Sequence, residues 1–376
     1  MIHALLYNFK FLLLIAASIV SIGILITIHE LGHFCFAKLF GVRTPSFSIG
    51  MGGPVLFSKK IGDTEFKINA IPLGGYLEIA GQAEIGQGDQ KEAHATDAGS
   101  FAVKPYWQKV LIMSGGVLFN FIAAFIVLIG LFWTGMPKTP FWGSETVRPI
   151  INSVVDNSTA QQLKLQLSDE IIEINGVSTP TIALLMQQLK ENTQKTVLLK
   201  IKRDGQLLNF SPTIEKTGQL GVYFKVDYLP GVSLTTSIKK ATYAIGTLTK
   251  KIFHDFTTII TKRAINNLAS PLWLVSFFVS SASNGISFLL MLLVFFSINL
   301  VILNLLPLPI TDGGQIIITG IETLTGKPLP EKVLNWLYLG TWGLLILLTI
   351  YLVIKDSILL FWPKIKALIA KITSLK

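Results

Sequence analysis

Apolar residues are grouped along this chain into long blocks that carry no charge, and polar stretches separate them. Residues 11–28 and 110–133 contain no Asp, Glu, Lys or Arg. About 20 consecutive apolar residues are enough for a helix to cross a bilayer. The pattern predicts four spanning helices, at about 11–36, 110–133, 286–308 and 333–354, which puts both ends of the chain on one side of the membrane.

The polar region 38–109, between the first two spans, has a strand-like first half. Apolar and polar residues alternate over 64–71, and Gly62-Asp63 supplies a turn before them. Such a strand could accept an extended substrate by edge pairing, and a self-contained hairpin is the alternative. Residues 82–100 are rich in Gln, Gly, Ala and Asp and are interpreted as a flexible linker.

Residues 147–228 are the one stretch that predicts a soluble domain. The pattern comprises a strand that ends at Asn175-Gly176, a helix at 181–192, and strands at 196–203 and 207–214 around Asp204-Gly205. The segment resembles the core of PDZ domains, which bind extended peptides or chain ends by strand addition. A recognisable carboxylate-binding loop is missing, and a purely structural β domain is the alternative.

The region before the third span is helical in pattern. Residues 237–263 mix lysines with apolar positions, as expected of a helix on the membrane surface. An uncharged stretch follows, in which 272–279 is too short to cross and predicts an interfacial or re-entrant piece.

Composition agrees with a membrane protein, since 51% of the 376 residues are hydrophobic and 14% are charged. The net charge of +10 comes from scattered Lys and Arg residues, so attraction to anionic lipid explains it better than nucleic acid does. No small-residue cleavage site follows the first apolar run, which we expect to be retained. The single cysteine, Cys35, excludes an internal disulfide, and we expect a small buried side chain there rather than a metal ligand.

An H-E-x-x-H motif, at His29, Glu30 and His33, interrupts the end of the first apolar block. On a helix the two histidines share one face and can bind one zinc ion, with Glu30 beside the open position as general base. Ionisable residues inside a spanning segment indicate a functional site, because burying them unpaired is costly. Two core histidines satisfied by neighbouring carbonyls are the alternative.

A third ligand must come from elsewhere, because catalytic zinc usually has three protein ligands. With four spans, the end of the third helix returns to the membrane depth of the histidines, and Asp312 stands there after two prolines and before Gly313-Gly314. We expect Asp312 to point inward from an irregular segment. The alternative for Asp312 is a helix cap at the membrane surface, and His94 and His254 are weaker candidate ligands.

Several motifs together extend over nearly the whole chain. They are His29 to His33, Phe47-Ser48-Ile49-Gly50, Ile71 to Tyr76, Gly116 with Asn120, and Asn304 to Gly314. In these motifs the chain resembles the bacterial group of the site-2 protease family of intramembrane zinc metalloproteases. It departs from the family pattern at Thr311, where Leu is usual, and at Val117, where Pro is common.

The resemblance implies one zinc ion per chain bound by His29, His33 and Asp312, with Glu30 as catalytic base. It also implies that Asn304 and the polar region after the first span hold an unwound substrate. The residues expected to bind substrate are Asn304, Asn120, Phe66, Ile68, Gly74 and Gly75.

The expected fold is a polytopic α-helical membrane protein with four transmembrane helices, a membrane-associated β-hairpin or sheet region and one inserted PDZ-like α+β domain. The expected segments are 1–37, 38–109, 110–133, 134–232 with its core at 147–228, 233–285, 286–314 and 315–376.

The expected function is cleavage of the transmembrane segments of single-pass proteins, such as anti-sigma factors or signal-peptide remnants, in regulated intramembrane proteolysis. The resemblance implies a bacterial cytoplasmic membrane, an active site toward the cytoplasm, and an extracytoplasmic PDZ-like domain that binds peptide segments or filters substrates by size. Lipid is an expected partner and nucleic acid is not. A non-catalytic receptor or scaffold that binds envelope proteins through the PDZ-like domain is the alternative.

Overall fold

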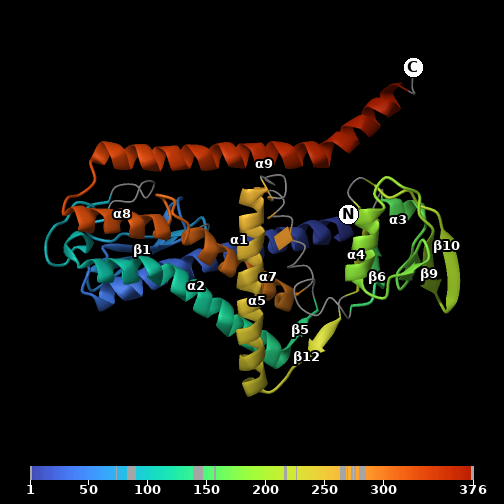
Figure 1. The fold of residues 1–376 in the computed structure, drawn as a ribbon, viewed down its shortest axis with the longest axis horizontal. Coiled ribbons are helices and arrows are strands. Elements are labelled where there is room, and N and C mark those ends of the chain that lie inside the picture. The colour runs from blue at the N-terminus through green and yellow to red at the C-terminus, as the bar shows by residue number, and fades with distance from the viewer. Residues whose placement is uncertain are drawn as a thin grey trace. The chain divides into compact units, whose positions relative to one another are not determined.

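The chain folds into two compact units, one formed by Met1–Ile129 with Ala241–Lys376 and the other by Gly130–Lys240. The computed structural model describes residues 2–72, 74–82, 90–138, 147–155, 158–215, 218–225, 227–262, 268, 270–271, 274, 277–278 and 285–373 (Figure 1).

The described residues contain four helices long and apolar enough to cross a membrane, as predicted. They are α1 (Ile2–Leu39), α2 (Tyr106–Thr134), α7 (Ile286–Asn304) and α9 (Glu331–Thr373). Helix α7 ends at Asn304 rather than near 308, because Pro307 cannot continue a helix. Helix α9 continues well past the predicted end of its span at 354.

Among the described residues, two more helices flank the third span along the chain. The predicted helix over 237–263 is present as α5 (Leu234–Thr261), and its position on the membrane surface stays a prediction. Helix α8 (Asp312–Thr325) was not predicted, although it has ordinary end signals: Thr311 is its N-cap and Gly326 adopts a left-handed conformation after its last turn. The predicted re-entrant piece at 272–279 lies largely outside the described residues.

The first unit contains a four-stranded sheet in the order β2-β3-β1-β4. Its strands are β1 (Ser46–Ile49), β2 (Val55–Ile61), β3 (Thr64–Asn69) and β4 (Gly75–Leu77). Strand β1 is parallel to β3, with Phe47 opposite Phe66, and antiparallel to β4. The ring of Phe34 on α1 lies 5.5 Å from Phe47 and 5.7 Å from Phe66 between centroids, so this face of the sheet packs on α1.

The predicted hairpin at 64–71 is present, because β2 pairs antiparallel with β3 around Gly62-Asp63. The prediction that 64–71 offers a free edge to substrate is wrong. Strand β3 is hydrogen-bonded to β2 on one side and to β1 on the other, so the outer strands of the sheet are β2 and β4. The long-range parallel pairing of β1 with β3 has no local sequence signal.

The interpretation of 82–100 as a flexible linker is wrong for 90–100. Residues 83–89 lie outside the described part of the chain. Arg43 donates to both carboxylate oxygens of Asp97, at 2.5 and 2.7 Å, and to Glu92 at 2.9 Å. Hydrogen bonds from Arg43 lower the pKa of Asp97, so the pair stays charged. The next turn, η1 (Phe101–Val103), buries Phe101 in the same core as Phe47.

Helices α1 and α2 cross with their backbones in close contact at Gly32 and Gly115. A Cβ atom added to Gly32 would lie 2.1 Å from the carbonyl oxygen of Gly115, and one added to Gly115 would lie 2.6 Å from that of Gly32. No other residue fits here without moving a backbone. Small residues at crossings of membrane helices allow this approach.

The second unit is an α+β fold with a separate core. It comprises β5 (Gly135–Pro137), β6 (Ile151–Val154), α3 (Thr159–Gln162), β7 (Glu170–Ile174), β8 (Val177–Ser178), α4 (Ile182–Glu191), β9 (Leu199–Arg203), β10 (Gln206–Phe210), β11 (Val222–Phe224) and β12 (Tyr228–Pro230). The main sheet has the order β10-β9-β7-β8, and two-stranded pairs join β11 to β6 and β12 to β5. Asn175-Gly176 and Asp204-Gly205 have positive φ, as two-residue hairpins of this kind require, so these predicted turns are confirmed.

The crossing of α1 and α2 generates a prediction for stability. Gly32→Ala should destabilise the protein by about 2 kcal/mol or more, because the added methyl group meets backbone rather than a flexible side chain. The measurement is the thermal unfolding midpoint of the purified protein in detergent. The matched control is Gly130→Ala on α2, where an added Cβ has open space. Equal midpoints for the two variants would contradict a close crossing.

Candidate metal centre

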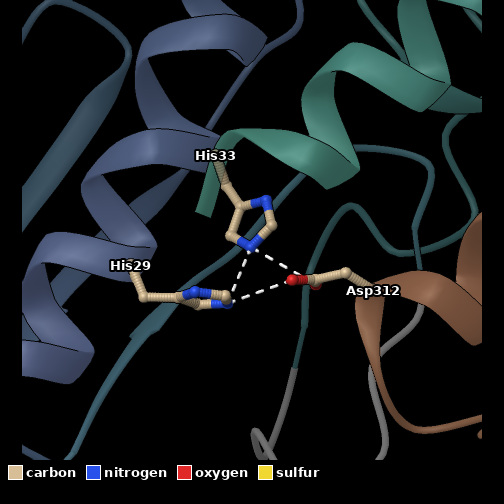
Figure 2. Close-up of side chains that lie close together, drawn as sticks. All are labelled: His29, His33 and Asp312. Carbon is tan, nitrogen blue, oxygen red and sulfur yellow. Dashed lines mark hydrogen bonds and ion pairs between the residues drawn. The ribbon is translucent and has the colours of Figure 1, made fainter. Parts of the chain in front are cut away.

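Two helices bring three side chains to one point. His29 and His33 lie one turn apart on α1, and Asp312 is the first residue of α8. The Nε2 atoms of the histidines are 3.1 Å apart, and the carboxylate oxygens of Asp312 lie 3.3 Å from His29 Nε2 and 3.4 Å from His33 Nε2. Figure 2 shows the three side chains pointing toward one another, the two histidines from α1 and Asp312 from the start of α8.

These distances fit a tetrahedral metal ion. Zinc bonds of about 2.0–2.2 Å at tetrahedral angles put ligand atoms roughly 3.3–3.6 Å apart. The two distances to the Asp312 carboxylate fall in this range, and the 3.1 Å between the histidine nitrogens is slightly shorter. Among the described residues, this is the one group of three His, Cys, Asp or Glu side chains close enough to hold a metal. Oδ2 of Asp312 is buried and has no hydrogen bond within the described part of the chain. A cation would satisfy that oxygen, so the residues fit a zinc ion.

Helix α2 supports the two imidazole rings. Nδ1 of His33 lies 2.8 Å from the carbonyl oxygen of Ile112, so this nitrogen is the donor and Nε2 is left as a ligand atom. Gly116 provides the space for both rings, because a Cβ there would lie 2.5 Å from His33 Nε2 and from His29 Cε1. The carbonyl of Ile112 was not predicted, since a backbone group on a distant helix has no sequence signal.

Asp312 is held by the start of α8 rather than by an irregular segment, so this detail of the prediction is wrong. The single proton of the Thr311 hydroxyl is shared between the carbonyls of Leu306 and Leu308, at 2.6 and 2.9 Å, and its oxygen accepts from Gly314 N. A Cβ on Gly314 would lie 1.8 Å from the carbonyl oxygen of Leu308. The threonine that departs from the family pattern therefore caps the helix that presents Asp312.

Glu30 follows His29 directly on α1 and lies beside the sheet. A Cβ on Gly75 of β4 would lie 3.8 Å from Cγ of Glu30 and 2.8 Å from the carbonyl oxygen of Ser48. An outer strand of the sheet thus passes next to Glu30, and a side chain at position 75 would occupy the space between them. Gly74 precedes it with a positive φ and sits against Met51.

Two asparagines adjoin His29. Nδ2 of Asn304, at the end of α7, lies 3.4 Å from His29 Nε2, and Nδ2 of Asn120 on α2 lies 3.3 Å from His29 Nδ1. Phe66 instead packs in the aromatic cluster with Phe34 and Phe47, and Ile68 is 43% exposed. The substrate-binding roles of all four residues stay predictions.

The remaining candidate ligands lie outside the group. His94 and His254 are not part of the metal-holding cluster found in the described residues. Cys35 is exposed, so the prediction of its burial is wrong. Position 35 is two residues beyond His33 and lies on the opposite side of α1.

The convergence of three ligands generates a prediction for metal content. Asp312→Ala should lower the zinc content of the purified protein well below one ion per chain, because two histidines alone bind a catalytic-type ion weakly. Elemental analysis of the purified protein measures this. Asp255→Ala, at an exposed position on α5, should keep the parent's zinc content. Stoichiometric zinc in Asp312→Ala would refute the assignment of Asp312.

Comparison with known proteins gives the family. The model of Peptidase family M50 matches residues 17–348. A relative from Clostridium perfringens, named as a zinc metalloprotease, is 30% identical over 91% of this chain and 97% of its own length. Relatives with the same kind of name come from Fusobacterium nucleatum, 31% identical over 90% of this chain and 96% of its own length, and Rickettsia conorii, 27% identical over 92% and 99%. The chain belongs to peptidase family M50 and is a membrane metalloprotease of that family.

Proposed function

We propose that this protein is an intramembrane endopeptidase of the site-2 type, which cleaves transmembrane segments of single-pass membrane proteins with one zinc ion held by His29, His33 and Asp312. The observation that carries the proposal is the convergence of Asp312, from α8, with two histidines that lie inside Ile15–Leu39, a helix apolar enough to span. A soluble protease has no need of such a position.

The chemistry is divided between the metal and the chain. His29, His33 and Asp312 would hold the zinc ion, which would supply Lewis-acid activation of a water molecule and of the scissile carbonyl. Glu30 accepts the proton of the attacking water and passes it to the leaving amine, because it lies next to a ligand and beside the sheet edge. The amide of Asn304, next to His29 Nε2, is a donor for the carbonyl oxygen of the bond to be cleaved.

Strand β4 is the element proposed to hold the substrate extended. Hydrogen bonds from Glu78 N to Ser46 O and from Gly50 N to Gly74 O direct the peptide groups of every second residue toward β1. Those of Gly75 and Leu77 therefore point to the open side of the sheet. A substrate paired there would pass Glu30 with its helical hydrogen bonds replaced by strand pairing.

The hairpin of β2 and β3, at the other edge of the sheet from β4, supports a membrane-associated sheet. Strand β2 is exposed along its whole length, and its first residues are apolar: Val55, Leu56 and Phe57 are 52%, 67% and 54% exposed. Its far end carries Lys59 and Lys60. An apolar end and a charged end suit insertion into lipid with the turn in water.

Lipid is also the proposed partner of α5. Exposed lysines recur eleven residues apart along one side of this helix, a spacing close to three full turns. They are Lys239 with Lys250, and Lys240 with Lys251, and Lys262 continues the spacing directly after the last residue of α5. Exposed Phe253 and Ile260 lie on another side. A helix with such sides fits the surface of an anionic bilayer.

The second unit is proposed to be a PDZ-like domain on the extracytoplasmic side of a bacterial cytoplasmic membrane, with the metal toward the cytoplasm. Spans alternate in direction, so the segment between α2 and α7 emerges on the side opposite the last turn of α1. The main sheet ends in the outer strands β8 and β10, which suits peptide binding by strand addition. On this topology the domain filters substrates by the size of their outer portion.

The role of Glu30 can be tested separately from metal binding. Glu30→Gln should keep stoichiometric zinc and lose about 10²- to 10⁴-fold in the cleavage rate of a single-pass model substrate, because the proton acceptor is gone. Cleavage by purified protein in detergent and elemental analysis are measured together. Glu331→Gln, at an exposed position at the start of α9, is the matched control. Full activity in Glu30→Gln would refute the mechanism.

The filter role can be tested with two substrates, one with its outer portion intact and one already trimmed. Deletion of 147–228 should allow cleavage of the intact substrate while the trimmed one is cleaved as before. Cleavage of both substrates is followed in membranes that contain each version of the enzyme. Loss of cleavage of both substrates would instead assign the domain a structural role.

A further inference from the structure

Asn120 is a fully buried polar side chain on a helix apolar enough to span the membrane. Its exposed fraction is 0%, and its amide nitrogen lies 3.3 Å from Nδ1 of His29. Its Oδ1 is buried and has no hydrogen bond within the part of the chain that the structure describes. Its backbone carbonyl accepts from the hydroxyl of Ser297 on α7 at 3.0 Å, which ties this turn of α2 in place.

Metal binding determines which nitrogen of His29 carries the proton. Nε2 of His29 faces His33 and Asp312 and must be unprotonated to bind a metal. The proton of the neutral ring is then on Nδ1, which becomes a donor. Nδ2 of Asn120 is also a donor, so two donors would face each other. The nitrogen and oxygen of a carboxamide are exchanged by a half-turn, which places Oδ1 against Nδ1–H. This rotation of the Asn120 carboxamide gives its Oδ1 a donor and gives Nδ1–H of His29 an acceptor.

We propose that Asn120 is a positioning residue for the metal centre, which accepts a hydrogen bond from Nδ1–H of His29 and holds the ring with Nε2 toward the metal. The inference rests on the proposed metal site and replaces the expected role of Asn120 in substrate binding. An outer partner of this kind fixes the orientation and the tautomer of a metal-binding imidazole.

The geometry of α2 supports the assignment. Ile112, Gly116 and Asn120 follow one another at intervals of four residues, and so do His33 and His29 on the neighbouring helix. The carbonyl of Ile112 accepts a hydrogen bond from Nδ1–H of His33, Gly116 leaves room for both rings, and Asn120 reaches His29. One face of α2 thereby supplies an outer partner to each histidine.

A rival acceptor is present on the same face. Gly116 lies against the ring of His29, and its backbone carbonyl is the other acceptor within this turn of α2. If that carbonyl alone held the ring, the side chain of Asn120 would be dispensable for metal binding. If Asn120 contacted substrate instead, its replacement would affect the KM for substrate and leave the affinity for zinc intact.

The test is the zinc affinity of the purified full-length protein, measured by competition with a chelator. Asn120→Leu has a similar shape without the acceptor and should weaken zinc binding about 10- to 100-fold. Asn120→Asp supplies a carboxylate acceptor and should restore the affinity to the parent value or above. The matched control is Asn299→Leu on α7, where the amide bonds within its own helix to Phe295 O and the affinity should not change.

A second variant and a second readout keep the proposal falsifiable if Asn120→Leu does not fold. Asn120→Ser is polar but too short to reach His29, and it should also bind zinc weakly. At saturating zinc, the KM of the variants for a single-pass substrate should equal that of the parent. Unchanged zinc affinity in both Asn120→Leu and Asn120→Ser would overturn the proposal, whether KM rises, as for a substrate contact, or stays the same, as for a ring held by Gly116. Because zinc binding is measured directly, the result stands even if the protein cleaves no substrate.

Discussion

The cost of burying ionisable groups in an apolar setting governs this structure. His29, Glu30 and His33 lie in a helix that spans by composition, and each polar group there needs a partner, because lipid offers none. The chain meets this need by bringing Asp312 to the histidines and by placing a carbonyl of α2 behind His33. The arrangement that satisfies these groups is also the arrangement of a metal centre, so the same contacts serve both stability and chemistry.

The backbone contact of Gly32 with Gly115 makes that arrangement possible. With any larger residue at the crossing, α2 would stand too far from α1 for Ile112 and Asn120 to reach the imidazoles. The four-residue spacing of the histidines on α1 matches the spacing along α2, so Ile112 and Asn120 lie next to His33 and His29 without any contribution from a loop. Asp312 alone comes from a third helix, as the first residue of α8, and there the hydroxyl of Thr311 ties the start of α8 to the chain before it. Groups carried by rigid elements keep their geometry better than groups on loops.

The sheet determines how a substrate could approach. Because β3 is occupied on both sides, the open edge nearest the metal centre belongs to β4, where Gly75 leaves space beside Glu30. The face that carries Phe47 and Phe66 is anchored on α1 through Phe34, so the position of this edge is coupled to the helix that carries the catalytic motif. Arg43 extends the anchoring to 90–100 through Glu92 and Asp97.

The sequence by itself determined the features that depend on short-range order: four spans, the i, i+4 histidines, the hairpin around Gly62-Asp63, and the turns at Asn175-Gly176 and Asp204-Gly205. Local periodicity and turn chemistry encode these directly. The proximity of Asp312 to the histidines followed from the number of spans, because the first and third spans end on the same side of the membrane. Only the tertiary structure decided that β3 is an inner strand, that 90–100 is held by Arg43, that α8 begins at Asp312, and that Ile112 and Asn120 stand behind the metal ligands. These features depend on contacts between distant segments, often through backbone groups that every residue has. The type of residue at a position therefore does not predict them.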